Sequence, residues 1–504
     1  MDPNDKPLIK KNKTKNNKCS NCGIARKIFS VSQLLCRKCF ALNSLIINCG
    51  NKNIDDLIKA SQRSKKYNDP YLEWVPFENF TNIKKIGQGG FSQIFKATWK
   101  INIGISYEGT INRSEREVVL KILNDSPNMD AEFLNELKHT IQFKTQSFII
   151  KCYGVTQDPQ TKNYAFILEY TPHGDLHHYI YGNFEAFTWE KKTRYLDFII
   201  KGIKKIHDMK IIHRDLHSGN ILINNYHPMI SDLGFSQPAN IDSNLTRESQ
   251  IYGIIPYMAP ELFNCHPYSY ASDVYSLGMI MWQLTSGHRP FHDQEHGPKL
   301  ILDILDGKRP EITEDTPECW ANLMKRCWHS NPSQRPTIEE FNELSTTFHY
   351  YYYHSEDYVK NNKPDKFDVW LEFKEANQTR FEMIESKKPF VKNSGYEHPN
   401  SRYYSTLLNP MLESISSRIS DIFSNNNNLL SNLSNDHFDV MDTNSNQKDN
   451  FENSDYNSSA ENSKKHFFDE LLEEENTEDQ NDFKRRRIAE YFNECFADKC
   501  TINH

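Results

Sequence analysis

The chain has 504 residues, of which 25% are charged, and its formal net charge is −7. This charge gives no support to a protein that binds nucleic acid over its whole surface. No run reaches the roughly 18 apolar residues of a membrane-spanning helix, and the N-terminal residues contain no apolar signal core. We therefore expect a soluble, cytoplasmic chain with reduced thiols and no membrane partner, long enough for two or three domains.

Two pairs of cysteines lie near the N-terminus, in CSNC (19–22) and CRKC (36–39). Two such turns can hold four thiolates in a tetrahedron around Zn²⁺, and Gly23 suits the tight turn after the first pair. Four free or redox-active thiols in an unfolded arm are the alternative. We predict a basic arm and a zinc-ribbon-like module in residues 1–50. The predicted zinc ligands are Cys19, Cys22, Cys36 and Cys39.

Residues 51–77 are predicted to form a helical linker. A helix over 53–67 would begin at Asn53 as its N-cap. It would carry Asp55 and Asp56 in its first turn, where carboxylates interact favourably with the helix dipole. Such a helix would connect the four-cysteine module to the segment that follows.

A glycine-rich turn in IGQGGFSQIF, residues 86–95, lies between two apolar runs. Gly87, Gly89 and Gly90 leave the backbone free of side chains, so that phosphate groups can approach it closely. The run continues into another predicted strand and not into a helix. This continuation argues against the dinucleotide-binding turn of a Rossmann fold.

Lys121 lies in EVVLKIL, residues 117–123, where β-branched neighbours predict a buried strand. A buried lysine needs a charge partner or a ligand, although a lysine at a strand edge usually keeps its charged end in water. The fitting partner is Glu136, in a stretch over 130–143 whose apolar residues recur at helical spacing. We predict that these two side chains form an ion pair.

Two later runs carry polar residues next to apolar strands. The run IIHRDLHSGNILI (211–223) places Asp215 five residues before Asn220, and SDLGFS (231–236) carries Asp232 after an apolar stretch. A carboxylate and an amide oxygen on one short loop can serve a substrate hydroxyl and a Mg²⁺ ion together.

Together these motifs resemble a eukaryotic protein kinase domain of the tyrosine-kinase-like group, over residues 78–350. The whole chain resembles an expanded kinase family of arbuscular mycorrhizal fungi. In that family a four-cysteine module and an LEWVPFENF-like segment, here residues 72–80, precede the kinase domain. The resemblance implies an α+β, bilobal kinase fold with a β-rich N-lobe and a helical C-lobe. It also implies ATP and Mg²⁺ as cofactors and proteins as substrates.

The resemblance assigns roles to the motif residues. Asp215 would orient the acceptor hydroxyl and accept its proton, while Asn220 and Asp232 would bind Mg²⁺. Lys121, held by Glu136, would bind the α- and β-phosphates. The other expected nucleotide contacts lie in the glycine-rich turn, the adenine pocket and the hinge: Ile86, Gly87, Gln88, Gly89, Gly90, Phe91, Ser92, Ile94, Val119, Glu169, Thr171 and Leu222.

The resemblance also implies supporting contacts. Glu261 of PYMAPEL is expected to pair with Arg335, and Asp273 is expected to brace the backbone of the catalytic loop. Arg214 would pair with a phosphate on the activation segment. The candidate phosphorylation sites are Thr246, Ser249 and Tyr252.

Five positions depart from the usual kinase pattern, and two of them are Val119 in place of an alanine and Leu233 in place of the phenylalanine of DFG. Ser92 replaces the third glycine of the turn, and Ile254 replaces a threonine of the activation segment. His217 replaces the lysine that contacts the γ-phosphate in serine/threonine kinases. The group resemblance favours serine and threonine as acceptors and leaves dual specificity open.

Two other functions remain open at this stage. Because His217 and Ile254 depart from the pattern, the main alternative is a pseudokinase that binds partners through the kinase fold and the four-cysteine module. A nucleic-acid-binding protein with an accessory kinase has only the basic N-terminal arm in its favour, so we do not expect nucleic acid as a partner.

Residues 351–410 are expected to form a C-terminal extension without a recognisable motif. Residues 411–504 are expected to form a mostly disordered tail rich in Asn, Ser and Asp. The KRRR run at 484–487 is a candidate nuclear import signal, although such a run is more often a solvated basic patch. The tail and the four-cysteine module are candidate sites for regulatory partners.

Overall fold

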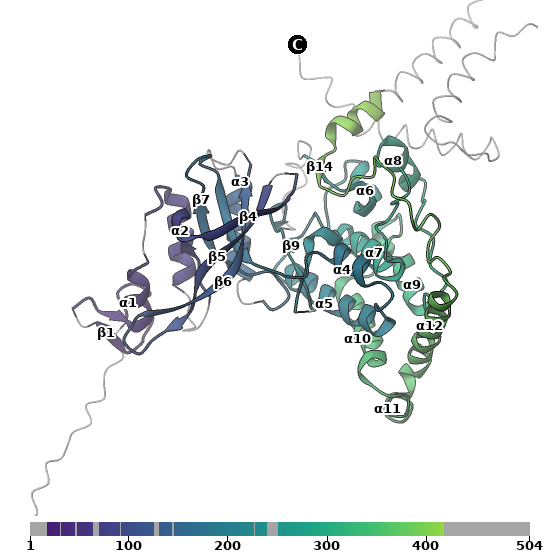
Figure 1. Ribbon diagram of the computed structural model, residues 1–504, viewed down its shortest axis with the longest axis horizontal. Helices are drawn as coiled ribbons and strands as arrows, with labels where there is room; N and C mark the ends of the chain where they lie inside the picture. Colours follow the sequence, from purple (N-terminus) through teal and green to yellow (C-terminus); the bar gives the residue numbers. More distant parts are fainter. Residues whose placement is uncertain are drawn as a thin grey trace, which may run out of the picture. The chain divides into compact units, whose positions relative to one another are not determined.

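The computed structural model describes these parts of the chain: residues 18–30, 32–45, 48–63, 70–90, 92–124, 131–143, 146–225, 227–238 and 250–417. They fold into two compact units (Figure 1). The first unit contains the described residues up to Gly174 together with Leu222–Ser236, and the second contains Asp175–Ile221 and those from Gln237 onward. The first unit is rich in strands and the second is mainly helical, which confirms the β-rich N-lobe and helical C-lobe of the predicted kinase fold.

The core of the first unit is a six-stranded sheet with the order β3-β7-β8-β6-β5-β4. Its strands are β3 (Glu73–Trp74), β4 (Thr81–Gln88), β5 (Ser92–Ile105), β6 (Ile111–Leu123), β7 (Cys152–Gln157) and β8 (Tyr164–Glu169). Neighbouring strands are antiparallel except for β3 and β7, which are parallel. Alternation along β6 buries Val118 and Leu120 in the hydrophobic core and turns Val119 and Lys121 to the other face.

Two helices of the first unit, α2 (Lys52–Gln62) and α3 (Ala131–Phe143), share one hydrophobic cluster with the sheet. Ile54 of α2 and Leu137 of α3 are buried in this cluster together with Phe166 of β8. The linker helix therefore supports α3, the helix that carries Glu136.

The linker helix α2 begins two residues earlier than predicted. Its N-cap is Asn51 and not Asn53, because the Asn51 side chain accepts hydrogen bonds from the backbone N–H groups of Asn53 and Ile54. The helix also ends earlier than predicted, at Gln62.

The LEWVPFENF segment, residues 72–80, forms an edge of the sheet through β3. Val75 and Phe80 are buried in the hydrophobic core. The backbone of the segment runs so close to β7 that a Cβ atom on Gly154 would lie 2.1 Å from the carbonyl oxygen of Glu73. Only glycine leaves room for this approach.

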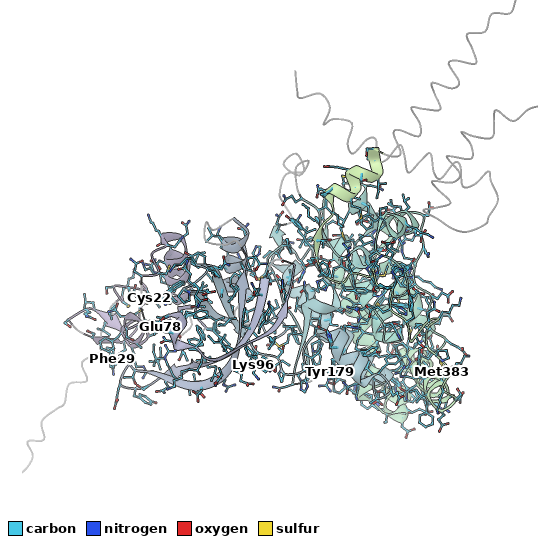
Figure 2. All side chains as sticks on the ribbon, turned by 45° about the horizontal axis from the view of Figure 1, so that its top comes forward. Cys22, Phe29, Glu78, Lys96, Tyr179 and Met383 are labelled. Atoms are coloured by element: carbon cyan, nitrogen blue, oxygen red, sulfur yellow. The ribbon has the colours of Figure 1, made fainter. Side chains whose placement is uncertain are left out.

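The four-cysteine module packs on the tip of the β5–β6 hairpin. Its elements are β1 (Ile28–Ser30), β2 (Leu35–Cys36) and α1 (Arg37–Asn43). The rings of Phe29 and Phe40 lie 5.1 Å apart, and both face Gly109 of the hairpin, where a Cβ atom would come within 3.0 Å of them. Figure 2 shows Phe29 and Cys22 at the same end of the first unit. This long hairpin, which the sequence did not predict, anchors the module.

The second unit is built around α7, a helix that is apolar on most sides. The helices of the kinase domain in this unit are α4 (Leu176–Asn183), α5 (Trp189–Asp208), α6 (Pro260–Phe263), α7 (Tyr270–Ser286), α8 (Pro298–Leu305), α9 (Glu318–Cys327) and α10 (Ile338–Tyr353). Every residue of α7 from 272 to 286 is buried, as expected for a helix without a polar face. A capping box of Ser269 and Ser272 begins α7, and Gly287 ends it at a φ of 80°.

Short elements complete the two units. The short strands are β9 (Ile211–Ile212), β10 (Ile221–Asn224), β11 (His227–Ile230), β12 (Gln237–Pro238), β13 (Tyr252–Gly253) and β14 (Thr406–Leu407). They form three pairs, β9 with β12, β10 with β11, and β13 with β14. Single turns of 3-10 helix are η1 (Phe77–Asn79), η2 (Ser218–Asn220), η4 (Ile255–Tyr257), η5 (Pro332–Gln334) and η6 (Pro364–Lys366).

The C-terminal extension is a folded part of the second unit, which the sequence did not predict. Its helices are α11 (Glu356–Asn362) and α12 (Phe367–Glu385). Phe373 of α12 is fully buried, with its ring 5.1 Å from that of Phe348 in α10. Arg380 is buried and lies 3.4 Å from Asp315, and Met383, labelled in Figure 2, is buried as well.

The extension also continues beyond the predicted boundary at residue 410. Residues 409–417 are helical, and Leu412 and Ile415 are buried. The remainder of the predicted tail, residues 418–504 with the KRRR run, lies outside the described residues. Among the residues that are described, no helix is both long and apolar enough to cross a lipid bilayer.

Candidate functional site

The glycine-rich turn joins β4 to β5 in the first unit. The described residues of the predicted turn are Ile86, Gly87, Gln88, Gly89, Gly90, Ser92 and Ile94. The N–H of Gly89 donates to the carbonyl of Ser92 at 2.8 Å and closes the turn. Ser92 is buried at the start of β5, so the serine in place of the third glycine is part of the strand. Phe91 lies outside the described residues.

Apolar residues predicted to surround adenine belong to the same unit. Ile86 is 48% exposed, whereas Ile94, Val119 and Leu222 are half-buried. In the sheet, Val119 pairs with Leu168, the residue next to the predicted hinge. A planar ring system could therefore pack against apolar side chains of the first unit.

The predicted hinge, residues 169–171, and the turn that follows it are tied to β10 by two hydrogen bonds. The N–H of Ile223 donates to the carbonyl of Gly174 at 2.8 Å, and the side chain of Asn224 donates to Glu169 Oε1 at 3.0 Å. These bonds hold β10, and with it Leu222, beside the hinge. Thr171, the other hinge residue assigned to the nucleotide, is buried.

Lys121 is the centre of a charged cluster in the first unit. Its Nζ lies 3.0 Å from Glu136 Oε1 and 2.8 Å from Asp232 Oδ1. Lys121 and Glu136 are 7% and 6% exposed. The predicted burial and the predicted ion pair are both confirmed, while the contact with Asp232 was not foreseen.

The surroundings of Lys121 keep it charged. Burial by itself favours the neutral amine, but the carboxylates of Asp232 and Glu136 outweigh burial and raise the pKa of Lys121 above its ordinary value. A cation fixed at this place in the sheet can bind phosphate oxygens.

Asp232 is held in an unusual backbone conformation. Its φ is 56°, in the left-handed region that residues other than glycine seldom adopt. Its Oδ1 accepts a hydrogen bond from the N–H of Gly234 at 3.3 Å. A Cβ atom on Gly234 would lie 3.0 Å from Glu136 Oε2, so the glycine of the DLG motif allows the two acidic side chains to approach. Leu233, in place of the usual phenylalanine, is buried.

In the second unit, Asp273 braces the catalytic loop as predicted. Its carboxylate accepts hydrogen bonds from the backbone N–H groups of His213 at 2.8 Å and Arg214 at 3.0 Å. His207 Nε2 lies 2.9 Å from the same carboxylate. Burial opposes the ionisation of Asp273, but these polar partners outweigh burial and hold its pKa below the ordinary value.

Asp215 and Asn220 lie together in this loop. Asn220 Nδ2 donates to the Asp215 carbonyl at 2.9 Å and lies 3.3 Å from Asp215 Oδ2. Because the amide nitrogen faces Asp215, the amide oxygen of Asn220 is the atom that would bind Mg²⁺. Burial would raise the pKa of Asp215, but His217 and a hydrogen bond from Ser405 lower it below the ordinary value.

His217 faces the carboxylate of Asp215. The Nδ1 atom of His217 accepts a hydrogen bond from the N–H of Gly219 at 3.1 Å, so the proton of the neutral ring lies on Nε2. Nε2 is 3.6 Å from Asp215 Oδ2. The imidazole is therefore aimed at the predicted base, where serine/threonine kinases carry a lysine.

Ser405 of the C-terminal extension also lies at Asp215, and sequence reasoning missed it. Its Oγ is 2.7 Å from each carboxylate oxygen of Asp215. No motif surrounds Ser405, and serine is common in polar segments, so no signal in the sequence marks this residue.

The contacts around the activation segment agree in part with the predictions. Arg335 donates to both carboxylate oxygens of Glu261 at 2.7 Å, which confirms the predicted ion pair. The guanidinium of Arg214 lies 4.1 Å from the ring centre of Tyr268. Of the candidate phosphorylation sites, Tyr252 lies in β13, whereas Thr246 and Ser249 fall outside the described residues.

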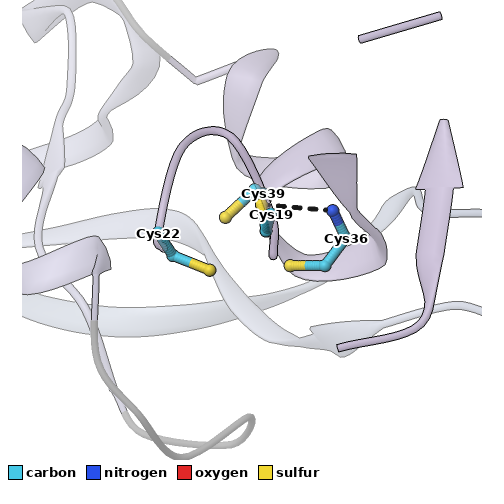
Figure 3. Close-up of side chains that lie close together, drawn as sticks. All are labelled: Cys19, Cys22, Cys36 and Cys39. Carbon is cyan, nitrogen blue, oxygen red and sulfur yellow. Dashed lines mark hydrogen bonds between the residues drawn. The ribbon is translucent and has the colours of Figure 1, made fainter. Parts of the chain in front are cut away.

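The four cysteines form a compact cluster. Their sulfur atoms lie within 4.8 Å of one another and point toward a common centre, as Figure 3 shows. The turn after the first pair is closed by the N–H of Gly23, which donates to the carbonyl of Cys19 at 2.9 Å, and Gly23 has the positive φ that was expected of it, 66°.

The electrostatics of the cluster suit a divalent cation. A hydrogen bond from the Cys39 thiol outweighs burial and lowers the pKa of Cys36 to about 4. The same contact with Cys36, together with burial, raises the pKa of Cys39. One thiolate therefore suppresses ionisation of its neighbour, and a bound Zn²⁺ would allow all four to ionise.

Comparison with known proteins places the chain in a family. A family model described as protein tyrosine and serine/threonine kinase matches residues 80–344, more than half of the chain. The chain therefore belongs to the protein kinase family. The matched residues include parts of both units.

The curated relatives are larger proteins. A probable serine/threonine-protein kinase of Dictyostelium discoideum is 27% identical over 304 residues, which are 58% of this chain and 16% of the relative. A putative serine/threonine-protein kinase/receptor of Acanthamoeba polyphaga mimivirus is 30% identical over 268 residues, 52% of this chain and 15% of the relative. Receptor-interacting serine/threonine-protein kinase 4 of Mus musculus is 28% identical over 276 residues, 52% of this chain and 33% of the relative. The chain thus spans less than two thirds of each.

The position of His217 leads to a prediction about turnover. A lysine there would place a permanent charge near the transferred phosphoryl group and stabilise the transition state. We expect His217→Lys to raise kcat while the KM for ATP stays the same. We expect His217→Ala to lower kcat about tenfold, equivalent to about 1.4 kcal/mol of activation free energy, because it removes the imidazole that faces Asp215 and the transferred group.

Steady-state kinetics of the two variants over pH 6 to 8 would measure both effects. His178→Ala is a matched control, since His178 is exposed and its ring contacts Asp175 and not Asp215. Equal kcat values for the wild type, His217→Lys and His217→Ala would show that this position makes no contribution to transfer.

Proposed function

We propose that this chain is an ATP-dependent protein kinase that transfers the γ-phosphate of ATP to serine and threonine hydroxyls of proteins. The observation that carries the proposal is a serine hydroxyl 2.7 Å from both oxygens of the buried Asp215 carboxylate. A general base makes this contact with the hydroxyl whose proton it accepts. The family membership of the chain and the names of its relatives support the same activity.

The phosphates and the metal would be held by three charged side chains and the amide of Asn220, and the adenine mainly by apolar side chains. Lys121 would bind the α- and β-phosphates, and Glu136 would keep the lysine in place. Asp232 and Asn220 would bind Mg²⁺, which neutralises charge on the phosphate oxygens. The expected adenine contacts are Ile86, Ile94, Val119, Glu169, Thr171 and Leu222.

The acceptor is best explained as serine or threonine. A serine side chain reaches Asp215 from an extended backbone segment, as Ser405 does. A pseudokinase scaffold gains no support, because Lys121 contacts Glu136 and Asn220 contacts Asp215. These contacts bring together side chains that phosphoryl transfer uses.

The finer kinship is also a proposal. We place the chain in the tyrosine-kinase-like group and, within it, near the expanded kinase family of arbuscular mycorrhizal fungi. The support is the order of its parts, in which a four-cysteine module, a linker helix and the LEWVPFENF segment precede the kinase domain. We propose the cytoplasm as its location, with the KRRR run as a candidate signal for import into the nucleus.

For the four-cysteine module we propose a structural zinc site with Cys19, Cys22, Cys36 and Cys39 as ligands. Three of these cysteines are buried, and the cluster supplies the hydrophobic centre of a very small module. A module of this size gains much of its stability from a bound metal. We also propose that the module binds regulatory partners.

The zinc site predicts a metal content. Full-length protein purified without chelators should contain about one Zn²⁺ per chain by elemental analysis. Cys36→Ser should lose the metal, because it removes one of four ligands, and Cys265→Ser should keep it, because Cys265 is exposed in the second unit and far along the chain. Zinc-free wild-type protein with an intact module would contradict the assignment.

The proposed activity predicts different effects for two Asp→Asn substitutions. Asp215→Asn should lower phosphoryl transfer by at least about 100-fold, because the general base is lost, and should leave Mg·ATP affinity nearly unchanged. Asp232→Asn should instead weaken Mg·ATP binding, because a metal ligand is lost. Asp208→Asn is the matched control, since Asp208 pairs with Lys204 on the surface of α5.

Transfer of labelled γ-phosphate to added protein, followed by phosphoamino-acid analysis, would test the activity and the acceptor together. The proposal expects phosphoserine and phosphothreonine in the product. Phosphotyrosine alone would refute the acceptor class, and full activity in Asp215→Asn would refute the assignment of the base.

A further inference from the structure

A segment of the C-terminal extension, residues 402–409, pairs with the activation segment through a two-residue strand, β14. Strand β14, which Figure 1 labels, pairs antiparallel with β13 in the register Thr406–Gly253 and Leu407–Tyr252. Extended peptides bind to exposed strand edges by main-chain pairing of this kind. We call residues 402–409 the acceptor segment. All of its residues belong to the second unit, as do Asp215 and β13.

Side chains fix the acceptor segment on both sides of β14. The hydroxyl of Tyr403 donates to the carbonyl of Pro290 at 2.9 Å, and the guanidinium of Arg289 lies 3.8 Å from the centre of its ring. Leu408 is buried, and its N–H donates to the carbonyl of Ile251 at 2.8 Å. These contacts set the register of the segment, because a shift by one residue would turn Leu408 out of the core.

This register presents Ser405 to Asp215. Ser405 is buried, and its Oγ lies 2.7 Å from both carboxylate oxygens. Of the two hydroxyl groups just before Ser405, that of Tyr403 donates to Pro290, while Tyr404 is 49% exposed. Ser405 therefore has the position of a substrate hydroxyl on its general base.

We propose that the acceptor segment is an intramolecular substrate of this chain's own catalytic loop and that Ser405 is phosphorylated in cis. The inference rests on the proposed kinase function and adds a modification site and an occupant for the strand edge of β13. While unphosphorylated, the segment also occupies the strand edge of β13, so other proteins must displace it before their own hydroxyl groups can reach Asp215.

The chemical step balances with ATP as the phosphoryl donor. Ser405 Oγ forms a bond to the γ-phosphorus, and the bond between that phosphorus and the β–γ bridging oxygen breaks. ADP leaves with the electron pair of that bond. The hydroxyl proton passes to the Asp215 carboxylate and from there to solvent, and no other reactant is needed.

After phosphorylation, the acceptor segment should bind less tightly beside Asp215. A phosphoserine carries close to two negative charges at neutral pH, and at this position it would lie beside the Asp215 carboxylate. Like charges in a buried site repel strongly. Phosphorylation of Ser405 therefore releases the acceptor segment and exposes the strand edge of β13 to other proteins.

The experiment follows phosphate on Ser405 in full-length protein. Protein treated first with a phosphatase is incubated with Mg·ATP, and peptides containing Ser405 are quantified by mass spectrometry. We expect a first-order rate constant that is unchanged over an about hundredfold range of protein concentration, because the acceptor is part of the same chain. A rate that rises in proportion to protein concentration would overturn phosphorylation in cis.

Two serine variants show where the phosphate goes. Ser405→Ala should lack this phosphorylation, whereas Ser401→Ala should retain it at the wild-type rate. Ser401 is a matched control, because its hydroxyl lies 3.3 Å from Glu397 and outside the acceptor segment. Phosphorylation of Ser405 should also increase kcat/KM toward an added serine-containing protein.

A third variant tests the docking of the segment. Tyr403→Ala removes the contacts with Pro290 and Arg289. It should slow Ser405 phosphorylation about tenfold, equivalent to about 1.4 kcal/mol of lost docking free energy. In unphosphorylated protein it should raise kcat/KM toward the added protein by a similar factor. Unchanged values for both rates would overturn the docking.

The outcomes separate this inference from the proposed function. If wild-type protein phosphorylates added protein but Ser405 stays unmodified, the inference fails and the kinase function stands. If neither Ser405 nor added protein receives phosphate, the kinase function fails, and the inference fails with it.

Discussion

The catalytic loop keeps its shape because one buried carboxylate, that of Asp273, accepts hydrogen bonds from two successive backbone N–H groups. His213 and Arg214 donate these bonds, and Arg214 is held at a φ of 73°. Residues other than glycine adopt such a conformation only when their surroundings support it. The position of Asp215 follows from this turn, and so does that of Asn220, whose side chain donates to Asp215. The contact between Asp215 and the extension therefore depends on a carboxylate that touches neither the nucleotide nor the acceptor.

A second buried charge cluster in the same unit holds the first part of the extension against the kinase domain. Arg380 of α12 lies 3.4 Å from Asp315, and Lys192 of α5 lies 3.5 Å from the same carboxylate. Burial outweighs the attraction of Asp315 and lowers the pKa of Lys192 to about 7. Charges of this kind are costly to bury, and removing one partner leaves the others uncompensated. These contacts fix helix α12 on the kinase domain. The residues that follow α12 and lead to the catalytic loop therefore start from a fixed position in the second unit.

The sequence predicted the parts whose chemistry fixes both residue type and order. Lys121 and Glu136 were identified as a pair because a buried lysine needs a carboxylate, and the structure confirms the contact. The extension could not be predicted in this way. Its helices are largely polar, and their few buried side chains follow no motif. Ser405 meets Asp215 across 190 positions of the chain, and such a contact arises from tertiary packing that local patterns do not encode. The anchoring of the four-cysteine module by a long hairpin was missed for the same reason.

The most direct test of this account is the kinetics of Asp273→Asn. The amide keeps the size of the side chain but turns one acceptor oxygen into a donor, which would face the N–H groups of His213 and Arg214. The loss of hydrogen bonds to a charged group, at about 1.5–3 kcal/mol each, predicts a fall in kcat of about 100-fold or more. Mg·ATP affinity should fall less than kcat, because this loop supplies only one of the proposed metal ligands, Asn220, whereas Lys121 and Asp232 lie in the first unit. Wild-type kcat in a folded Asp273→Asn protein would contradict the account, because the catalytic loop would then keep its shape without this carboxylate.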